Sequence, residues 1–210
     1  MKISVIGLGP VGLTTVTCFA HRGFRAAGVD TDEARVETLS KNQMPFYEPD
    51  LESLVYETTI SGRLSFTTDY GQAVLTSDVS FVCVGTPPLS SGIADLRYVE
   101  SSLKSIGRML KEKNRYHLVV IRSTVPPGTT GGLAKKILEL SSGKRAGQDF
   151  GLCCNPEFLR EGSAVQDTFH PDRVVIGELD RGSGDMLTDL WERFYPCLLY
   201  TSDAADEEDS

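Results

Sequence analysis

Three glycines near the amino terminus, placed between an apolar strand-like run and a helical pattern, restrict the fold of this chain most. The run KISVIG is short, β-rich and ends at glycine, and GPVGLTTVTCFAHRG continues with apolar residues at helical spacing until Gly23. Gly7, Gly9 and Gly12 form the pattern G-x-G-x-x-G at this junction. The first glycine permits a tight turn, the second lets backbone approach a pyrophosphate, and the third allows the helix to pack closely on the strand. The sequence therefore predicts a dinucleotide-binding turn.

The alternation of apolar strands with helical patterns continues along the chain. Further strands are expected in FRAAGVD, LSFTTD, DVSFVCVG, HLVVIRS, DFGLCCNP and RVVIGE. Helices are expected in TDEARVETLSKN, with Thr31 as a candidate cap, and in YGQAVLTS, DLRYVESSLKSIGRMLKEK, PPGTTGGLAKKILELSS and DMLTDLWERFY. Right-handed crossovers place such helices on both faces of a parallel sheet. The predicted fold class is α/β, with a doubly wound, mostly parallel, Rossmann-like sheet.

The same pattern suggests how the chain is divided. We expect residues 1–177 to form the dinucleotide-binding domain and residues 178–200 to begin a following helical segment. Residues 201–210 have no apolar face to bury and are expected to be disordered, or a non-native remnant of cloning or sequence assembly.

Charge and hydropathy exclude several classes of partner. The formal net charge is −8, and the acidic residues crowd into the terminal DAADEEDS. Such a surface does not favour nucleic acid or anionic lipid. No apolar run approaches the roughly 20 residues of a spanning helix, and the first apolar stretch lacks a small-residue cleavage site. We therefore expect a cytoplasmic protein that binds neither nucleic acid nor a membrane.

The cysteine pattern argues against disulfides and against a metal site. Five cysteines form an odd set without regular spacing, so a secreted disulfide framework is not expected. Cys153 and Cys154 are adjacent in a predicted strand, so their side chains point to opposite faces and cannot easily share a metal. With Cys18 and Cys83, they are expected to be reduced, buried, small apolar residues.

Asp30 closes the second predicted strand and favours NAD over NADP. A carboxylate there accepts hydrogen bonds from the adenosine ribose and repels a 2′-phosphate. Arg35 lies close enough to bind that phosphate, so both residues are assigned to the cofactor together with Val11 of the glycine turn. The alternative interpretation is that the glycines make an ordinary turn and that Asp30 caps the next helix.

Three motifs each follow a predicted strand: VGTPP (84–88), STVPPGT (123–129) and NPEFLREGSA (155–164). They therefore lie at the carboxyl ends of a parallel sheet, the edge at which open α/β folds bind ligands. Together with YEPDL (47–51) and ADL (94–96), these motifs closely resemble the UDP-glucose/GDP-mannose dehydrogenase family. The resemblance extends from Met1 to about Gly177.

Members of this family oxidise the C6 alcohol of a nucleotide sugar to a carboxylate in two hydride transfers to NAD, through an aldehyde and a cysteine thioester. The resemblance implies that Thr86 and Thr124 line the nicotinamide side of the site, and that Thr124 helps to hold the catalytic water. It also implies NAD as cofactor, a nucleotide-sugar substrate and a full-length protein that is homo-oligomeric, with a dimer as the expected state.

The resemblance assigns NPEFLREG to the reacting end. Glu157 and Glu161 would stand at the reacting carbon, one as a base or water holder and the other near cofactor and substrate, because alcohol oxidation needs a proton acceptor and thioester hydrolysis an activated water. Phe158, Leu159 and Arg160 would contact the sugar nucleotide. The two glutamates could face one site if this stretch turns helically. On residue types alone, Glu157 is instead a helix cap and Glu161 pairs with Arg160 at the surface.

The chain also departs from the family pattern. Family members continue into a connecting helix and a second domain with the nucleophilic cysteine, and none of the cysteines here, including Cys197, matches that context. Pro10 replaces a usual aromatic residue and removes one possible phosphate donor. EFLREG favours UDP-glucose; GDP-mannose, a UDP-N-acetylhexosamine, and a non-catalytic NAD-sensing module are the alternatives. The isolated chain is expected to bind NAD weakly without turnover.

Several further residues are interpreted as structural. Asp172 and Arg173, in PDRVVIG, are expected to form a local pair at the start of a strand that continues the sheet. His21, His117 and His170 match no catalytic position and are expected at the surface or at element ends.

Overall fold

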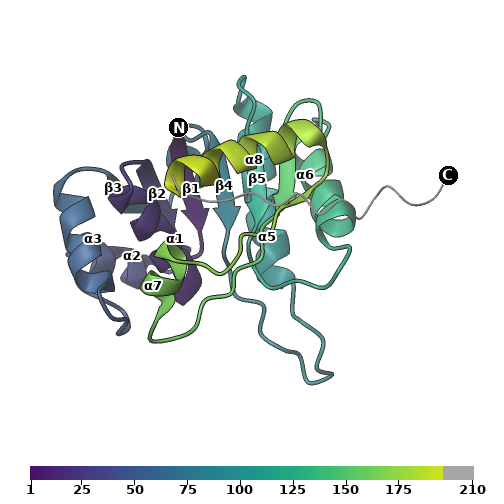
Figure 1. The fold of residues 1–210 in the computed structure, drawn as a ribbon. Coiled ribbons are helices and arrows are strands. Elements are labelled where there is room, and N and C mark those ends of the chain that lie inside the picture. The colour runs from purple at the N-terminus through teal and green to yellow at the C-terminus, as the bar shows by residue number, and fades with distance from the viewer. Residues whose placement is uncertain (196–210) are drawn as a thin grey trace.

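Seven strands form one sheet in the computed structural model, which describes residues 1–195 (Figure 1). The strands are β1 (Lys2–Ile6), β2 (Arg25–Val29), β3 (Leu64–Thr67), β4 (Val79–Val82), β5 (Leu118–Ile121), β6 (Gly151–Cys154) and β7 (Gly177–Glu178). The helices are α1 (Pro10–His21), α2 (Glu33–Ser40), α3 (Leu51–Ile60), α4 (Tyr70–Val74), α5 (Arg97–Glu112), the π-helical η1 (Thr130–Ala134), α6 (Lys135–Ser142), α7 (Ala164–Phe169) and α8 (Arg181–Phe194).

The strand order is β3-β2-β1-β4-β5-β6-β7, and every neighbouring pair is parallel except β6 and β7. From β1 the chain winds outward to β2 and β3, and then returns to β4 on the other side of β1. The carboxyl ends of β1 and β4 therefore form the topological switch point, where a crevice opens in doubly wound folds. This confirms the predicted α/β fold class.

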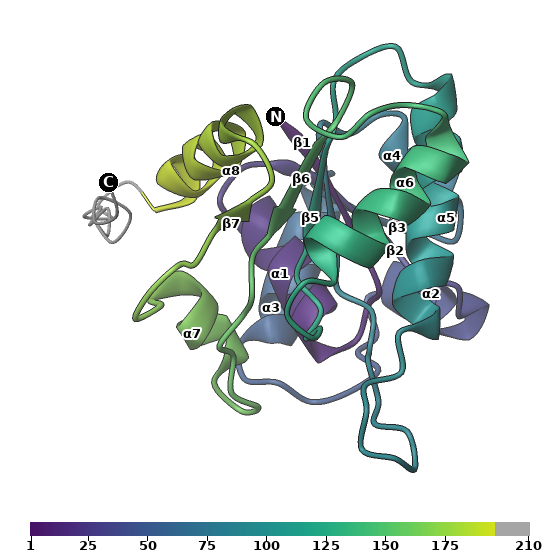
Figure 2. The same ribbon diagram turned by 90° about the vertical axis from the view of Figure 1, so that its right-hand side faces the viewer.

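Helices cover both faces of the sheet (Figure 2). One core contains apolar residues of α1, α3, α7 and α8, and the other contains those of α4, α5 and α6. In the first core, the Phe19 ring of α1 lies 5.2 Å from Trp191 and 5.1 Å from Phe194 of α8, centroid to centroid. The helix that follows residue 177 is therefore packed on the same sheet as the strands before it.

The structure departs from the expected elements in four places. Helices α3 and α7 were not expected, because LESLVYETTI and AVQDTF have no strong apolar stripe. RVVIGE contributes only the two residues of β7, which are antiparallel to β6. The N-cap of α2 is Asp32, whose carboxylate accepts from the Arg35 amide at 3.1 Å, rather than Thr31.

His117 lies at an element end, immediately before β5, but it is completely buried rather than at the surface. Its Nδ1 lies 2.7 Å from Lys113 Nζ and its Nε2 lies 2.8 Å from Ser80 Oγ. Ser80 Oγ is in turn 2.6 Å from Ser4 Oγ. Lys113 Nζ also donates to the Val74 and Ser77 carbonyls. This buried polar network joins β1, β4 and the entry to β5.

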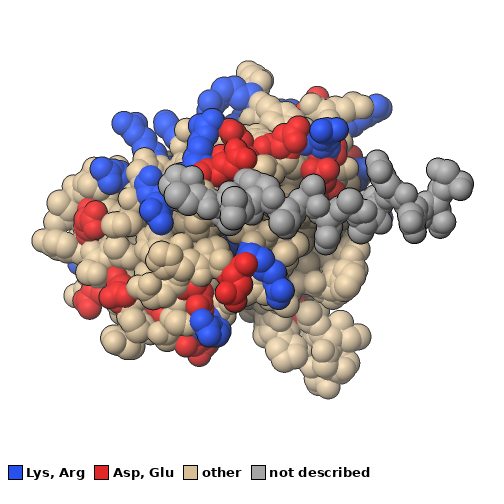
Figure 3. All heavy atoms as spheres, viewed as in Figure 1, with Lys and Arg blue, Asp and Glu red and all other residues tan. Residues whose placement is uncertain are grey.

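The cysteines and the surface largely agree with the sequence. Cys18, Cys83 and Cys153 are buried and Cys154 is half-buried, while Cys197 and residues 201–210 lie outside the described residues. Figure 3 shows Lys, Arg, Asp and Glu interspersed over α8, whereas the protruding segment 83–96 carries almost no charge. Within residues 1–195, no helix is both long and apolar enough to cross a membrane.

Candidate functional site

A cavity of about 510 Å³ opens at the carboxyl edge of the sheet, at the switch point. It collects residues that follow β1, β2, β4, β5 and β6, so segments distant in sequence meet there. Its volume lies in the range of cofactor pockets. The lining residues are Gly7, Gly9, Pro10, Val11, Asp30, Thr31, Arg35, Tyr70, Cys83, Val84, Gly85, Thr86, Tyr98, Ser101, Ser102, Arg122, Ser123, Thr124 and Glu157.

The glycine turn has no room for a side chain at Gly7 or Gly12, whereas Gly9 borders open space that a ligand can occupy. Gly7 has φ +94°, and a Cβ there would meet the Val84 backbone at 2.9 Å. A Cβ on Gly12 would approach the Gly7 carbonyl oxygen to 1.8 Å, so α1 packs directly on the turn. Gly9, which precedes α1, faces open space within 4 Å. Backbone at Gly9 is therefore accessible to a pyrophosphate, beside the positive end of the helix dipole.

Asp30 and Arg35 form the wall beyond this turn. One Asp30 oxygen accepts from the Leu8 amide at 2.8 Å and the other from the Asp32 amide at 3.0 Å. Arg35 Nη1 donates to the Leu8 carbonyl at 3.1 Å, and its Nε lies 3.9 Å from Asp30. That Nε is buried without a hydrogen-bond partner among the described residues. A carboxylate and a guanidinium thus stand side by side where an adenosine ribose would lie.

Two threonines connect the loops at the opposite end of the cavity. Thr86 Oγ1, after β4, donates to the Thr124 carbonyl, after β5, at 2.7 Å. Ser123 Oγ donates to the Val84 carbonyl at 2.7 Å, which provides a second connection between the same loops. Both predicted threonines therefore lie at one rim, together with Glu157.

Arg122 is a buried cation at the base of this rim. It is 6% exposed, and its Nη1 donates to Asn155 Oδ1 at 2.6 Å, while its Cζ lies 5.5 Å from the Trp191 ring centre. Its Nε has no partner, and no carboxylate lies within ion-pair distance of it, among residues 1–195. Burial lowers the pKa of this guanidinium, and the nearby Cys83 and Glu157 raise it. A positive charge thus remains beside the end where Glu157 lies.

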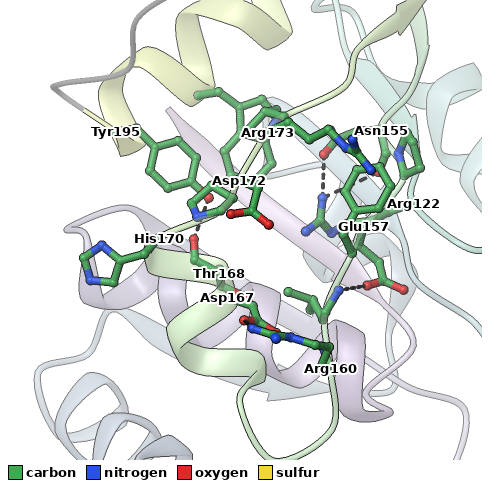
Figure 4. A pocket seen from close by; sticks show the side chains of 16 residues that line it. Arg122, Asn155, Glu157, Arg160, Asp167, Thr168, His170, Asp172, Arg173 and Tyr195 are labelled. Carbon is green, nitrogen blue, oxygen red and sulfur yellow. Dashed lines mark hydrogen bonds and ion pairs between the residues drawn. The ribbon is translucent and has the colours of Figure 1, made fainter.

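A second cavity of about 230 Å³ adjoins the first, and Arg122 and Glu157 line both (Figure 4). Phe158, Leu159 and Arg160 line only this second cavity. The Arg173 guanidinium lies 4.7 Å from the Phe158 ring centre rather than forming the expected pair with Asp172 in the described part of the chain. The residues expected to contact a sugar nucleotide therefore gather beside the cofactor cavity.

The two glutamates of this motif are placed differently. Residues 155–160 do not turn helically, so Glu157 and Glu161 do not share a face. Glu157 Oε2 accepts from the Leu159 amide at 2.5 Å and the residue lines both cavities, whereas Glu161 is exposed and lines neither. Arg160 pairs with Asp167 at 2.6 Å rather than with Glu161, and these hydrogen bonds hold the pKa of Asp167 well below its ordinary value.

Several lining residues were not found from the sequence. Tyr70, Tyr98, Ser101 and Ser102 come from α4 and α5, and Arg122 precedes the STVPPGT motif. Tyr98 and Ser101 belong to an amphipathic helix pattern, which does not distinguish residues that face a cavity from those that face solvent. Arg122 directly follows β5, and a charge at the end of a buried strand is a signal that sequence analysis can use.

No cluster of three or more His, Cys, Asp or Glu able to hold a metal occurs in residues 1–195. Burial raises the pKa of Cys18, Cys83 and Cys153 to about 12, so each is a protonated, weak nucleophile at neutral pH.

Comparisons with known proteins agree with this geometry. The family model for the NAD binding domain of the UDP-glucose/GDP-mannose dehydrogenase family matches residues 1–195. GDP-mannose 6-dehydrogenase of Pseudomonas aeruginosa is 44% identical over 98% of this chain and 48% of its own length. UDP-glucose 6-dehydrogenase TuaD of Bacillus subtilis is 40% identical over 96% of this chain and 42% of its own length.

Solved structures show the same likeness. The ternary complex of GDP-mannose dehydrogenase from P. aeruginosa matches with a TM-score of 0.90 and 45% identity, over 91% of this chain and 44% of that one. A UDP-glucose dehydrogenase from Pyrobaculum islandicum matches with a TM-score of 0.86 and 45% identity, over 91% and 44%. This chain spans about half the length of the relatives that it matches. The chain belongs to the UDP-glucose/GDP-mannose dehydrogenase family, contains its NAD-binding domain and uses NAD as its cofactor.

Proposed function

We propose that this chain is the NAD-binding half of an enzyme that oxidises the C6 alcohol of a nucleotide sugar to a carboxylate. The observation that carries the proposal is the cavity of about 510 Å³, with the glycine turn and Asp30 at one end and Thr86, Thr124 and Glu157 at the other. The strand order β2-β1-β4-β5-β6 spreads these residues along the sheet edge, which suits an extended dinucleotide whose nicotinamide would lie at the threonine end.

Glu157 is proposed as the proton acceptor or water holder at the reacting carbon. It lines both cavities, a position from which it would face both a cofactor and a substrate. NAD, when bound, supplies the acceptor for the hydride. The alcohol proton must leave in the same oxidation, and a carboxylate in that position takes it. Arg122, a buried cation, lines the same two cavities as Glu157.

Thr124 is proposed to orient water and nicotinamide from the other side of the site. Its carbonyl accepts a hydrogen bond from the Thr86 hydroxyl, which links the two threonines. Phe158, Leu159 and Arg160 are proposed to contact the sugar nucleotide in the second cavity. Glu161 is proposed as a substrate contact on the family resemblance alone, since it is exposed outside both cavities.

The proposed substrate is UDP-glucose or GDP-mannose. The EFLREG motif favours UDP-glucose, whereas GDP-mannose 6-dehydrogenases are among the similar relatives. Catalysis is proposed to require a nucleophilic cysteine from a further domain, so the isolated chain binds NAD without turnover. Cytoplasmic location and homodimerisation stay predictions from the sequence.

Calorimetric titration of the chain with NAD, and separately with NADP, tests the cofactor assignment. We expect NAD to bind and NADP to bind at least tenfold more weakly, because Asp30 repels a 2′-phosphate. Absence of binding by a chain with a cooperative melting transition would contradict the proposal. NADH formation is then followed with UDP-glucose and with GDP-mannose; sustained turnover by the isolated chain would contradict its assignment as the cofactor-binding half.

A further inference from the structure

The motif YEPDL (47–51) contacts the loop that carries Glu157 and Glu161, although more than a hundred positions separate the two segments. Glu48 is 7% exposed and its carboxylate accepts from two backbone amides. Its Oε2 lies 2.9 Å from the Gly162 nitrogen and its Oε1 lies 2.8 Å from the Ala164 nitrogen. These residues are separated from Glu48 by 114 and 116 positions. Glu48 is thus a long-range tie between the segment before α3 and the segment before α7.

Two residues just before these amides donate to two other carboxylates. Glu157 accepts from the Leu159 amide at 2.5 Å, and Asp167 accepts from the Arg160 amide at 2.9 Å. The loop 157–164 has little regular secondary structure. Four of its backbone N–H groups donate to carboxylates instead. Glu48 supplies two of these four bonds.

The backbone geometry at Gly162 makes the conformation of the loop depend on its hydrogen bonds to Glu48. Gly162 has φ +83°, a conformation that glycine tolerates and other residues avoid, and its surroundings are open within 4 Å. Packing around Gly162 therefore does little to fix the reversal that follows Glu161. A charge-assisted bond from a buried carboxylate is stronger than one between neutral groups, so Glu48 provides the restraint that packing does not.

A second contact between the same segments supports this interpretation. Asp50, two residues further, has φ +65°, and its side chain accepts from Gln166 Nε2 at 3.3 Å. The segment 48–50 thus contacts α7 at its first residue, Ala164, and again two residues later at Gln166. Three side-chain hydrogen bonds therefore align segment 48–50 with residues 162–166.

We propose that Glu48 is a positioning residue of the site, which holds loop 157–164 so that Glu157 faces both cavities and Leu159 faces the second one. It touches neither cavity, and it acts through the Gly162 and Ala164 amides. This inference rests on the proposed function, because that function assigns Glu157 and its neighbours to the reaction. It adds a residue that neither the family motif roles nor the cavity linings include.

The test compares Glu48→Gln with Glu52→Gln, a matched loss of charge at an exposed residue in the first turn of α3. Amide hydrogen exchange is measured by NMR in the 210-residue chain. The sequence around the measured amides is unchanged, so their intrinsic exchange rates are identical in all variants. We expect tenfold or faster exchange at Gly162 and Ala164 in Glu48→Gln, a smaller acceleration at Leu159 and Arg160, and no change in Glu52→Gln. Wild-type protection at Gly162 and Ala164 in Glu48→Gln would overturn the proposal.

A second readout separates positioning from simple support of α7. NAD is titrated into each variant while the Leu159 amide signal is followed, because Leu159 donates to Glu157, which lines the cofactor cavity. We expect an NAD-dependent shift in the wild type, and at least a halving of it in Glu48→Gln with the Kd for NAD within twofold. An unaltered shift would show that Glu48 supports α7 alone and would overturn the proposal.

Glu48→Asp covers the case in which Glu48→Gln does not fold. Aspartate keeps the charge but is one methylene shorter, so intermediate exchange at Gly162 and Ala164 is expected. Unfolding of both variants, or faster exchange throughout β5 and β6, would overturn the proposal, since Glu48 would then support the whole fold. If the wild type does not bind NAD, the proposed function fails, while the exchange measurement still decides whether Glu48 holds the loop.

Discussion

Gly9 and Gly12 of the turn have different roles. Substitution of Gly9 should weaken NAD binding, whereas substitution of Gly12 should lower the free energy of unfolding. Gly9 faces open space, so Gly9→Ala should leave the free energy of unfolding within about 1 kcal/mol of wild type while its methyl group obstructs the pyrophosphate. We expect at least a tenfold rise in the Kd for NAD by calorimetry. An unchanged Kd would mean that phosphate does not approach the turn at Gly9.

Gly12→Ala is the complementary change. Its methyl group would meet the Gly7 carbonyl oxygen at 1.8 Å, so α1 must move away from the turn. Such overpacking costs about 1–3 kcal/mol. Urea denaturation should show this loss of stability in Gly12→Ala, and the same experiment on Gly9→Ala is the control. Equal stability of the two variants would contradict the described packing.

Asp30 should set the choice between NAD and NADP because Arg35 stands beside it. Asp30→Asn keeps an acceptor for the Leu8 amide and removes the charge that repels a 2′-phosphate, leaving Arg35 to attract it. We expect weaker binding of NAD and stronger binding of NADP by calorimetry, with the ratio of the two Kd values changed at least tenfold. Asp32→Asn is the control, since asparagine caps α2 equally well. A ratio unaffected by Asp30→Asn would remove Asp30 from cofactor selection.

Sequence patterns located most of these single residues, but not their partners. Gly7 and Asp30 were assigned from the glycine pattern and the strand end, and Thr86 and Thr124 from the family resemblance. Their motifs were expected at one edge, because a parallel sheet brings strand ends together. The position of Glu161 depends on an irregular loop held by Glu48, a residue more than a hundred positions away. No local pattern encodes such a contact, and the helical turn that would have let Glu157 and Glu161 share one face is absent from residues 155–160.

At the scale of secondary-structure elements, the stability of the entry to β5 should depend on pH through His117. Burial, followed by the positive charge of Lys113, lowers the pKa of His117 from 6.5 to about 3. The folded chain therefore keeps His117 neutral, whereas the unfolded chain takes up a proton below about pH 6.5. The stability contributed by this histidine is complete above that pH and is lost as the pH falls towards 3.

Urea denaturation at pH 7.5 and pH 5.0 measures this effect. We expect a loss of about 2 kcal/mol attributable to His117, at about 1.4 kcal/mol per pH unit below its unfolded pKa. His117→Gln can accept from Lys113 and donate to Ser80, so the variant should fold with a flatter pH dependence. His170→Gln, at an exposed position, should retain the wild-type slope. Equal slopes in both variants would contradict a neutral, buried His117.

Elements with a regular apolar pattern were predicted well, and those held by tertiary contacts were not. Strands β1, β4 and β5 and helices α1 and α5 follow directly from their periodicity. The short helix α7 is fixed by Glu48 and by packing on α1, and β7 by two residues of pairing with β6. Propensity is a weak guide for such segments, because their environment decides their structure.

Across the whole molecule, α8 makes the sheet and the segment after residue 177 one packed unit. Leu187, Leu190, Trp191 and Phe194 belong to the same core as α1. A chain truncated after Gly177 loses all four. Removal of one large aromatic side chain from a core costs about 3–5 kcal/mol, whereas a domain has about 5–15 kcal/mol of stability in all.

We therefore expect the chain that ends at Gly177 to lose its cooperative thermal transition and to bind the apolar dye ANS. The chain that ends at Tyr195 keeps every described element and should melt as the 210-residue chain does. Circular dichroism melting of the three chains provides the measurement. A cooperative transition in the shortest chain would instead support a domain that ends at residue 177, as the sequence alone suggests.

The hydrogen bond from Thr86 to the Thr124 carbonyl has a kinetic consequence. It joins the loops after β4 and β5, so the end of the cavity at which we propose the nicotinamide binds is preorganised. Binding then avoids much of the entropy cost of ordering two loops, and association is not delayed by their closure. Differences in affinity among cofactor analogues should therefore arise in their dissociation rates, with similar association rates for all.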